Sequence, residues 1–161
     1  MKLCLKEAMK RISLLEQQKR DILSDESSNC MTTYGAGEEK EKVEYDFTDV
    51  RTHVAALDSE IRRIKHNLHL ANATVRIDEF DMTLGECIIY LAQLNNEKGT
   101  LERMARRELK TRKTAYGGGV EWTELNYSRE ACREQLKKVT EDIVKLQMVI
   151  DRSNLTHEIE V

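Results

Sequence analysis

The chain has 161 residues, with 26 basic and 29 acidic side chains, a formal net charge of −3 and no proline. The length suits one domain, and the mixed charges give no global field that would attract nucleic acid or membranes. Charged residues make up 34% of the chain and aromatic residues only 5%, which is typical of helices with narrow apolar stripes. We therefore expect a single all-α domain, residues 1–161.

The sequence contains no feature of a secreted or membrane protein. No stretch approaches the roughly 18–20 consecutive apolar residues that span a bilayer. The apolar start, 1–5, is interrupted by Lys6 and Glu7 before the apolar region of a signal peptide forms. We expect a cytoplasmic protein with no membrane partner.

Four cysteines lie far apart, at Cys4, Cys30, Cys87 and Cys132, with no C-x-x-C spacing between them. Most of them fall in helical patterns, where a small apolar side chain packs well, so we expect buried free thiols. A zinc site assembled from distant cysteines is the alternative, although the paired spacing typical of such sites is missing.

The first helix is expected from about Lys2 to Ser24, because apolar residues recur at helical spacing; they are Leu5, Met9, Ile12, Leu15 and Ile22. Lys19 interrupts this stripe. Residues 24–45 then lose the periodicity and gather Ser, Asn, Thr and Gly, so we expect a long mobile loop between helices one and two.

The second helix, residues 46–72, has the clearest pattern in the chain. Its apolar residues alternate spacings of three and four without an error; they are Phe47, Val50, Val54, Leu57, Ile61, Ile64, Leu68 and Ala71. This is a heptad seam on a helix about 40 Å long, which requires a partner of similar length.

The third helix is expected over residues 84–114, between a T-x-x-E capping box at Thr83 and Glu86 and the triple glycine 117–119. A fourth helix follows a cap at Ser128. Its seam consists of Cys132, Leu136, Val139, Ile143, Leu146, Ile150 and Ser153. We expect four long helices in an antiparallel coiled-coil-like bundle, in which the seams of helices two and four bury each other, within one chain or between chains.

Two short segments, 73–77 and 119–122, are rich in β-branched or aromatic residues. They are consistent with a small two-stranded β-ribbon joining the end of helix two to the start of helix four. Trp122, in the second segment, is expected to anchor a loop on the bundle.

Two patterns suggest binding chemistry, and each has a simpler interpretation. His66 and His69 are spaced to reach one metal ion, but no further ligand accompanies them, so exposed histidines are the favoured reading. The basic stretch 103–113 carries six basic residues, and four of them lie along one helical face, as phosphate binding would require; they are Arg103, Arg106, Arg107 and Lys110. Because no aromatic residue interleaves with the bases, we expect a solvated face and regard a nucleic-acid partner as unlikely.

The segments Met1-Lys2-Leu3, 61–65 and 72–74, Thr83-Leu84 and the closing residues 150–159 resemble the septicolysin-like family of small bacterial helical proteins. In the closing segment Leu155 stands where the family usually has tryptophan, and residues 24–45 lack the family's proline-containing acidic turn. The resemblance implies an all-α fold and supplies no catalytic residues. Most members of the family have no assigned function, and its name comes from a supposed pore-forming toxin.

The sequence therefore predicts an uncharacterised, non-enzymatic helical protein that forms homo-oligomers through its seams. No catalytic motif, cofactor or small-molecule ligand is predicted. A membrane-active protein of the septicolysin type is the first alternative, although the seams are too narrow to coat a lipid-facing surface. Nucleic-acid binding through residues 103–113 is the second alternative.

Overall fold

The computed structural model describes all 161 residues and contains four long helices. They are α1 (Leu5–Asn29), α2 (Phe47–Thr74), α3 (Leu84–Ala105) and α4 (Arg129–Thr156). Three antiparallel two-stranded sheets accompany them, made by β1 (Lys2–Cys4) with β6 (Glu158–Glu160), β2 (Arg76–Ile77) with β3 (Met82–Thr83), and β4 (Lys110–Thr114) with β5 (Val120–Glu124). The predicted helical class and the four long helices are confirmed. None of the helices is both long enough and apolar enough to cross a membrane.

Contacts divide the chain into two compact units. The first consists of residues 1–74 together with 153–161, and the second of residues 75–152. Each unit is built around an antiparallel pair of helices. The chain therefore contains two helical hairpins, α1 with α2 and α3 with α4, and the expectation that the seams of helices two and four bury each other within one chain is wrong.

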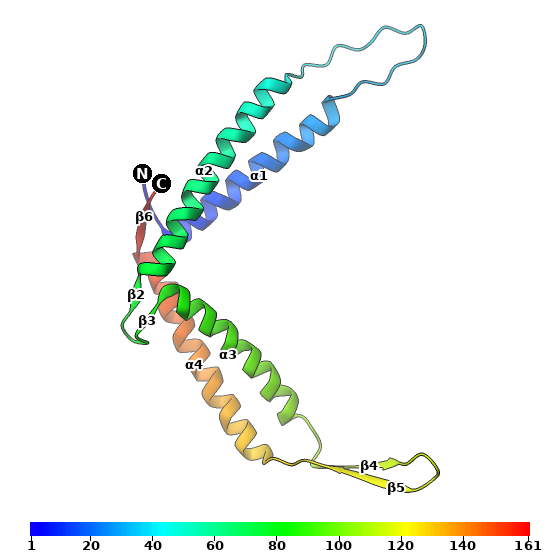
Figure 1. Ribbon diagram of the computed structural model, residues 1–161, viewed down its shortest axis with the longest axis vertical. Helices are drawn as coiled ribbons and strands as arrows, with labels where there is room; N and C mark the ends of the chain where they lie inside the picture. The colour runs from blue at the N-terminus through cyan, green and yellow to red at the C-terminus, as the bar shows by residue number, and fades with distance from the viewer. The chain divides into compact units, whose positions relative to one another are not determined.

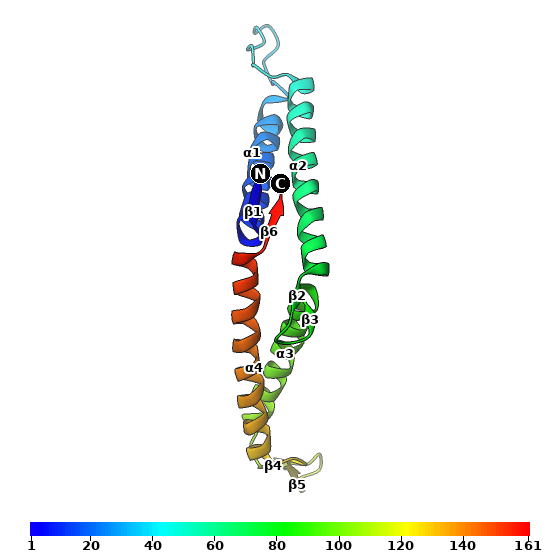
Figure 2. The same cartoon turned by 90° about the vertical axis from the view of Figure 1, so that its left-hand side faces the viewer.

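In the first unit, α1 lies beside α2 (Figures 1 and 2), and the two bury an apolar core between them. Its buried side chains are Leu5, Ala8, Ile12 and Leu15 from α1, and Ile61, Ile64 and Ala71 from α2. The sheet of β1 and β6 joins the two ends of the chain, with Leu3 opposite Ile159. The Asn67 side chain donates to the carbonyl of Glu160 at 2.7 Å, so β6 is tied to α2.

In the second unit, α3 and α4 lie side by side in both views (Figures 1 and 2). The Cys132 thiol approaches the carbonyl of Leu101 at 3.5 Å, and the Tyr127 hydroxyl donates to the carbonyl of Met104 at 2.8 Å. Buried side chains on α3 are Leu84, Cys87 and Leu94, and those on α4 include Cys132, Val139, Ile143 and Leu146. Most of the predicted seam of helix four is therefore buried.

The predicted capping residues of α3 and α4 are confirmed. The Glu86 amide donates to the Thr83 hydroxyl at 3.2 Å, while the Glu86 carboxylate accepts from the Thr83 amide at 2.6 Å. The hydroxyl of Ser128 accepts from the amide of Ala131 at 3.2 Å. These bonds satisfy backbone donors that the first turn of a helix leaves without partners.

The predicted β-ribbon is wrong in its pairing. Both segments contain a strand, but β2 pairs with β3 and β5 pairs with β4. Each strand therefore pairs with its neighbour along the chain, across a short turn, because a local hairpin costs less loop entropy than a long-range ribbon. One of these turns, 78–81, holds Asp81 at φ 51°, a left-handed conformation that aspartate tolerates better than most residues.

Two helix ends differ from the prediction. The helix α1 continues to Asn29, five residues beyond the expected Ser24, and the Glu26 carboxylate in this extension accepts from Tyr45 at 2.9 Å. The helix α3 ends at Ala105 instead of 114. Residues 110–114, which include two β-branched threonines, leave the helix because they pair along their whole length with β5.

Truncation of the α2 core is expected to destabilise the protein strongly. Ile64 has an exposed fraction of 0%, so Ile64→Ala should lower the free energy of unfolding by about 2–5 kcal/mol through lost burial and a cavity. Leu70 on the same helix is 55% exposed, and Leu70→Ala should change it by less than about 0.5 kcal/mol. Urea unfolding followed by circular dichroism measures both, and equal effects would contradict the described core.

Candidate functional site

Burial of the α2 seam changes along the helix. Ile61 and Ile64 are buried, whereas Val54 and Leu57 are half-buried and Phe47 is 61% exposed. The heptad spacing continues without interruption through all of these positions. The half of the seam nearest the α1–α2 connection is therefore apolar but only partly covered by α1.

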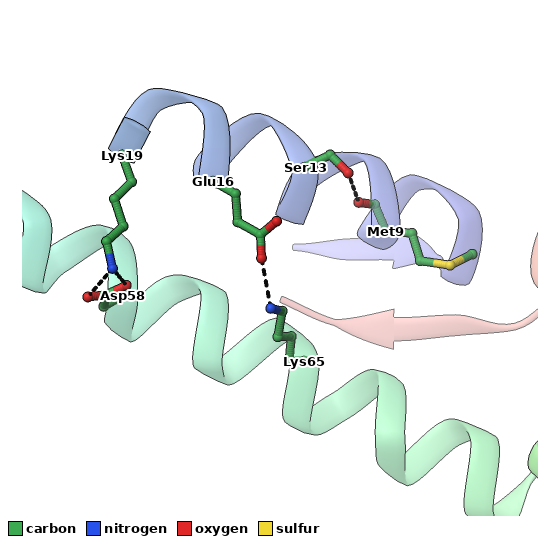
Figure 3. Close-up of polar contacts among 6 residues, drawn as sticks. All are labelled: Met9, Ser13, Glu16, Lys19, Asp58 and Lys65. Carbon is green, nitrogen blue, oxygen red and sulfur yellow. Dashed lines mark hydrogen bonds and ion pairs between the residues drawn. The ribbon is translucent and has the colours of Figure 1, made fainter. Parts of the chain in front are cut away.

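One flank of the α2 seam carries a ladder of ion pairs to α1. Its α2 members are Arg51, Asp58 and Lys65, spaced seven residues apart, and their partners on α1 are Glu26, Lys19 and Glu16. The Lys19 ammonium reaches both Asp58 oxygens, at 2.7 and 2.8 Å, and Lys65 binds Glu16 at 2.7 Å (Figure 3). We call these three pairs the charge ladder. Lys19, which interrupts the predicted stripe of helix one, is its middle member.

The signs of the charge ladder alternate along α2, and this alternation opposes a shifted register. Sliding α1 by one heptad in either direction would place Lys19 beside Arg51 or Lys65 instead of Asp58. Like charges in contact destabilise a coiled coil, so charges beside the seam select register and orientation. The paired side chains retain exposed fractions of 17–49%, so each pair contributes at most about 1 kcal/mol.

The opposite flank of the seam is an open groove of about 490 Å³. It is lined by Gln18, Asp21 and Ile22 from α1 and by His53, Ala56, Leu57 and Glu60 from α2. Apolar side chains form its floor, and Glu60 at the rim binds Arg11 at 2.8 Å. The groove therefore includes Leu57 from the half of the seam that α1 covers only partly, and we call it the α1–α2 groove.

Three carboxyl groups have a lowered pKa because they accept hydrogen bonds in the folded state. The bond from Lys65 and the positive charge of that side chain lower the pKa of Glu16. Backbone and side-chain bonds from Cys4 lower the pKa of Glu7, and those from Thr83 lower the pKa of Glu86. All three groups stabilise helix ends or helix pairing, and none lies in the α1–α2 groove.

The predicted histidine pair and the four cysteines form no metal site. His66 and His69 are both exposed, and no group of three or more His, Cys, Asp and Glu side chains is arranged to hold a metal ion. All four cysteines are free, and burial raises the pKa of the Cys87 thiol. The expectation of buried thiols is wrong for Cys30, which is exposed at the end of α1.

The basic stretch 103–113 is not one continuous helical face. Arg103 lies in the last turn of α3, whereas Lys110, Arg112 and Lys113 belong to β4. Trp122 of β5 lies directly opposite Arg112 and is 57% exposed, so it does not anchor a loop on the helices. The linear sequence does not show this association of basic residues with an aromatic ring, because it depends on the register of a hairpin that the periodicity does not indicate.

Comparison with known proteins shows the fold but no activity. No family model matches the chain, and neither does any curated protein. A crystal structure of a functionally unknown conserved protein from Corynebacterium diphtheriae is similar, with a TM-score of 0.68 over 99% of this chain and 100% of that one. The two sequences are 13% identical over this alignment. The chain therefore shares its fold with a conserved bacterial protein.

Reversal of one charge in the ladder should destabilise the α1–α2 pair, and exchange of both charges should restore it. We expect Lys19→Glu to lower the free energy of unfolding by about 1 kcal/mol, because it opposes Asp58 with a like charge. The double variant Lys19→Glu, Asp58→Lys should recover most of this loss. Arg63→Glu, an exposed position of α2 without an ion pair, is the matched control in urea unfolding. A double variant no more stable than Lys19→Glu would contradict the ladder.

Stability should fall in acid through the groups with lowered pKa. The ordinary carboxyl value is 4.5, and the folded-state pKa of Glu16 lies below it. Its contribution is therefore complete above pH 4.5 and is lost as the pH falls through the folded-state pKa. Thermal unfolding of the wild type and Glu16→Gln across this range checks the effect. The variant should be less stable at neutral pH and lose less stability in acid, and parallel curves would contradict the assignment.

Proposed function

We propose that this protein is a non-enzymatic helical protein that functions by self-association, with a second copy covering the α1–α2 groove. The proposal rests on a difference between the heptad pattern of α2, which is continuous, and the burial of its apolar side chains, which is not. The heptad seam is continuous from Phe47 to Ala71, but only its second half has buried members. The apolar residues that α1 leaves exposed are available for packing against a second partner helix.

A second helical hairpin would complete the core that two helices leave open. Two helices cannot enclose an apolar stripe on all sides, whereas a four-helix arrangement can, because each seam then meets neighbours on both flanks. The charge ladder occupies one flank of the α1–α2 pair, so the groove is the flank left for a partner. Ala56 is the smallest side chain lining it and would allow close approach of another helix.

A second copy of this chain suits the groove better than a lipid surface. Asp21 lines the groove, and its negative charge would oppose the anionic lipids of a membrane surface. Two-fold pairing of identical surfaces is the commonest form of protein self-association, and it brings apolar floor against apolar floor. The absence of catalytic function remains a prediction from the sequence, as does the resemblance to the septicolysin-like family.

Sedimentation equilibrium tests this proposal. The wild type should sediment with at least twice the 18.7 kDa of one chain. Ala56→Arg introduces a long side chain into the groove, and we expect it to raise the dissociation constant by at least about ten-fold, because its bulk would prevent the close approach of a second helix.

Ser59→Arg is the matched control, since Ser59 is exposed on the same helix and does not line the groove. It should associate as the wild type does. At concentrations where each sediments as a single chain, the two variants should have similar unfolding midpoints, because both positions are exposed in one chain. A wild type that sediments as a single chain up to high micromolar concentration, or equal association of the two variants, would overturn the proposal.

A further inference from the structure

The hairpin of β4 and β5 is exposed on both faces. All five side chains of β5 and four of the five in β4 are exposed. It is attached at its base, where the Leu125 amide donates to the Leu109 carbonyl at 3.1 Å and Tyr127 binds Met104. Two-stranded hairpins are only marginally stable in water, so an exposed one with large aromatic side chains indicates a surface that meets a partner.

Positive charge is concentrated around this hairpin. Residues 103–124 contain six bases and three acids, a net charge of +3, so the rest of the chain carries −6. Lys110 is paired with Glu124, whereas the other five basic residues form no ion pair; these are Arg103, Arg106, Arg107, Arg112 and Lys113. Basic side chains without ion-pair partners, on an exposed hairpin, favour a polyanionic partner.

Aromatic rings lie among these bases, which the linear sequence does not show. Strand register places Arg112 opposite Trp122, and Lys110 lies over the same ring with its ammonium 4.8 Å from the ring centre. Tyr116, at the hairpin tip, is fully exposed. The tip glycines Gly117 and Gly118 have φ of 109° and 86°, so they form the turn that presents Tyr116.

We propose that the β4–β5 hairpin binds single-stranded nucleic acid. Arg112, which shares a face of the hairpin with Trp122, and the arginines at the end of α3 hold phosphates, and the exposed rings of Trp122 and Tyr116 stack on unpaired nucleobases. Exposed aromatic side chains within a basic surface are the usual means of binding single strands without strong sequence preference.

Single strands fit these observations better than two other polyanions. An acidic protein segment would satisfy the bases but leaves the rings without a role. A duplex presents phosphates, but its bases are stacked on each other, so the rings could engage them only after unstacking, which costs free energy. The proposal is independent of self-association, because the hairpin and the α1–α2 groove share no residue.

Fluorescence provides a direct test, because Trp122 is the only tryptophan in the chain. A mixed-sequence single-stranded oligonucleotide should quench the Trp122 emission, and the same oligonucleotide carrying fluorescein should gain anisotropy. We expect Tyr116→Ala and Trp122→Ala to weaken binding roughly ten-fold each, since stacking is lost. Arg112→Ala should weaken binding and reduce the slope of log affinity against log salt by about one.

Controls separate the outcomes. Lys138→Ala removes an exposed base from α4 and should bind as the wild type does, while Trp122→Phe should keep most of the affinity. A duplex of the same sequence, and polyglutamate, should bind more weakly than the single strand. Absence of binding at low salt would overturn the proposal, and so would equal binding of polyglutamate or duplex, or unchanged affinity of the Trp122→Ala and Arg112→Ala variants.

Discussion

The charge ladder between α1 and α2 is the constraint on which the first unit depends. An error-free heptad seam repeats its apolar pattern every seven residues and therefore accepts several registers almost equally well. Alternating signs at Arg51, Asp58 and Lys65 favour a single register, because only that register places an opposite charge of α1 beside each of them. The ladder thus supplies specificity at little gain in stability, while the buried apolar residues supply most of the free energy.

The same register determines which apolar surface remains open. The ladder holds α1 against one flank of the seam, and the other flank becomes the α1–α2 groove, with Leu57 and Ala56 among its lining residues. Rotating α1 to cover the groove would separate Lys19 from Asp58 and leave the ladder flank uncovered. Two helices therefore cannot cover both flanks of the seam. A second hairpin on the open flank would cover it without disturbing the ion pairs.

The sequence predicted what depends on local periodicity and missed what depends on distant pairing. The seams, the four helices and the caps at Thr83 and Ser128 follow from spacings of a few residues, and the structure has them. The pairing of β1 with β6 joins residues more than 150 positions apart, and no local pattern indicates it. Lys19 looked like a defect, because its partner Asp58 lies on another helix. The α1–α2 groove was equally invisible, since it arises only once the two helices are packed.

The end of α3 shows how one such error changes a functional conclusion. Read as a helix to residue 114, the bases formed a stripe without aromatic neighbours, which argued against nucleic acid. In the structure the chain leaves the helix at Ala105, and β4 brings Arg112 opposite Trp122. Alternation along a strand then sorts the side chains, so that Lys110, Arg112 and Trp122 share one face. This change of secondary structure thus places basic side chains beside an aromatic ring, and binding of a single strand requires both.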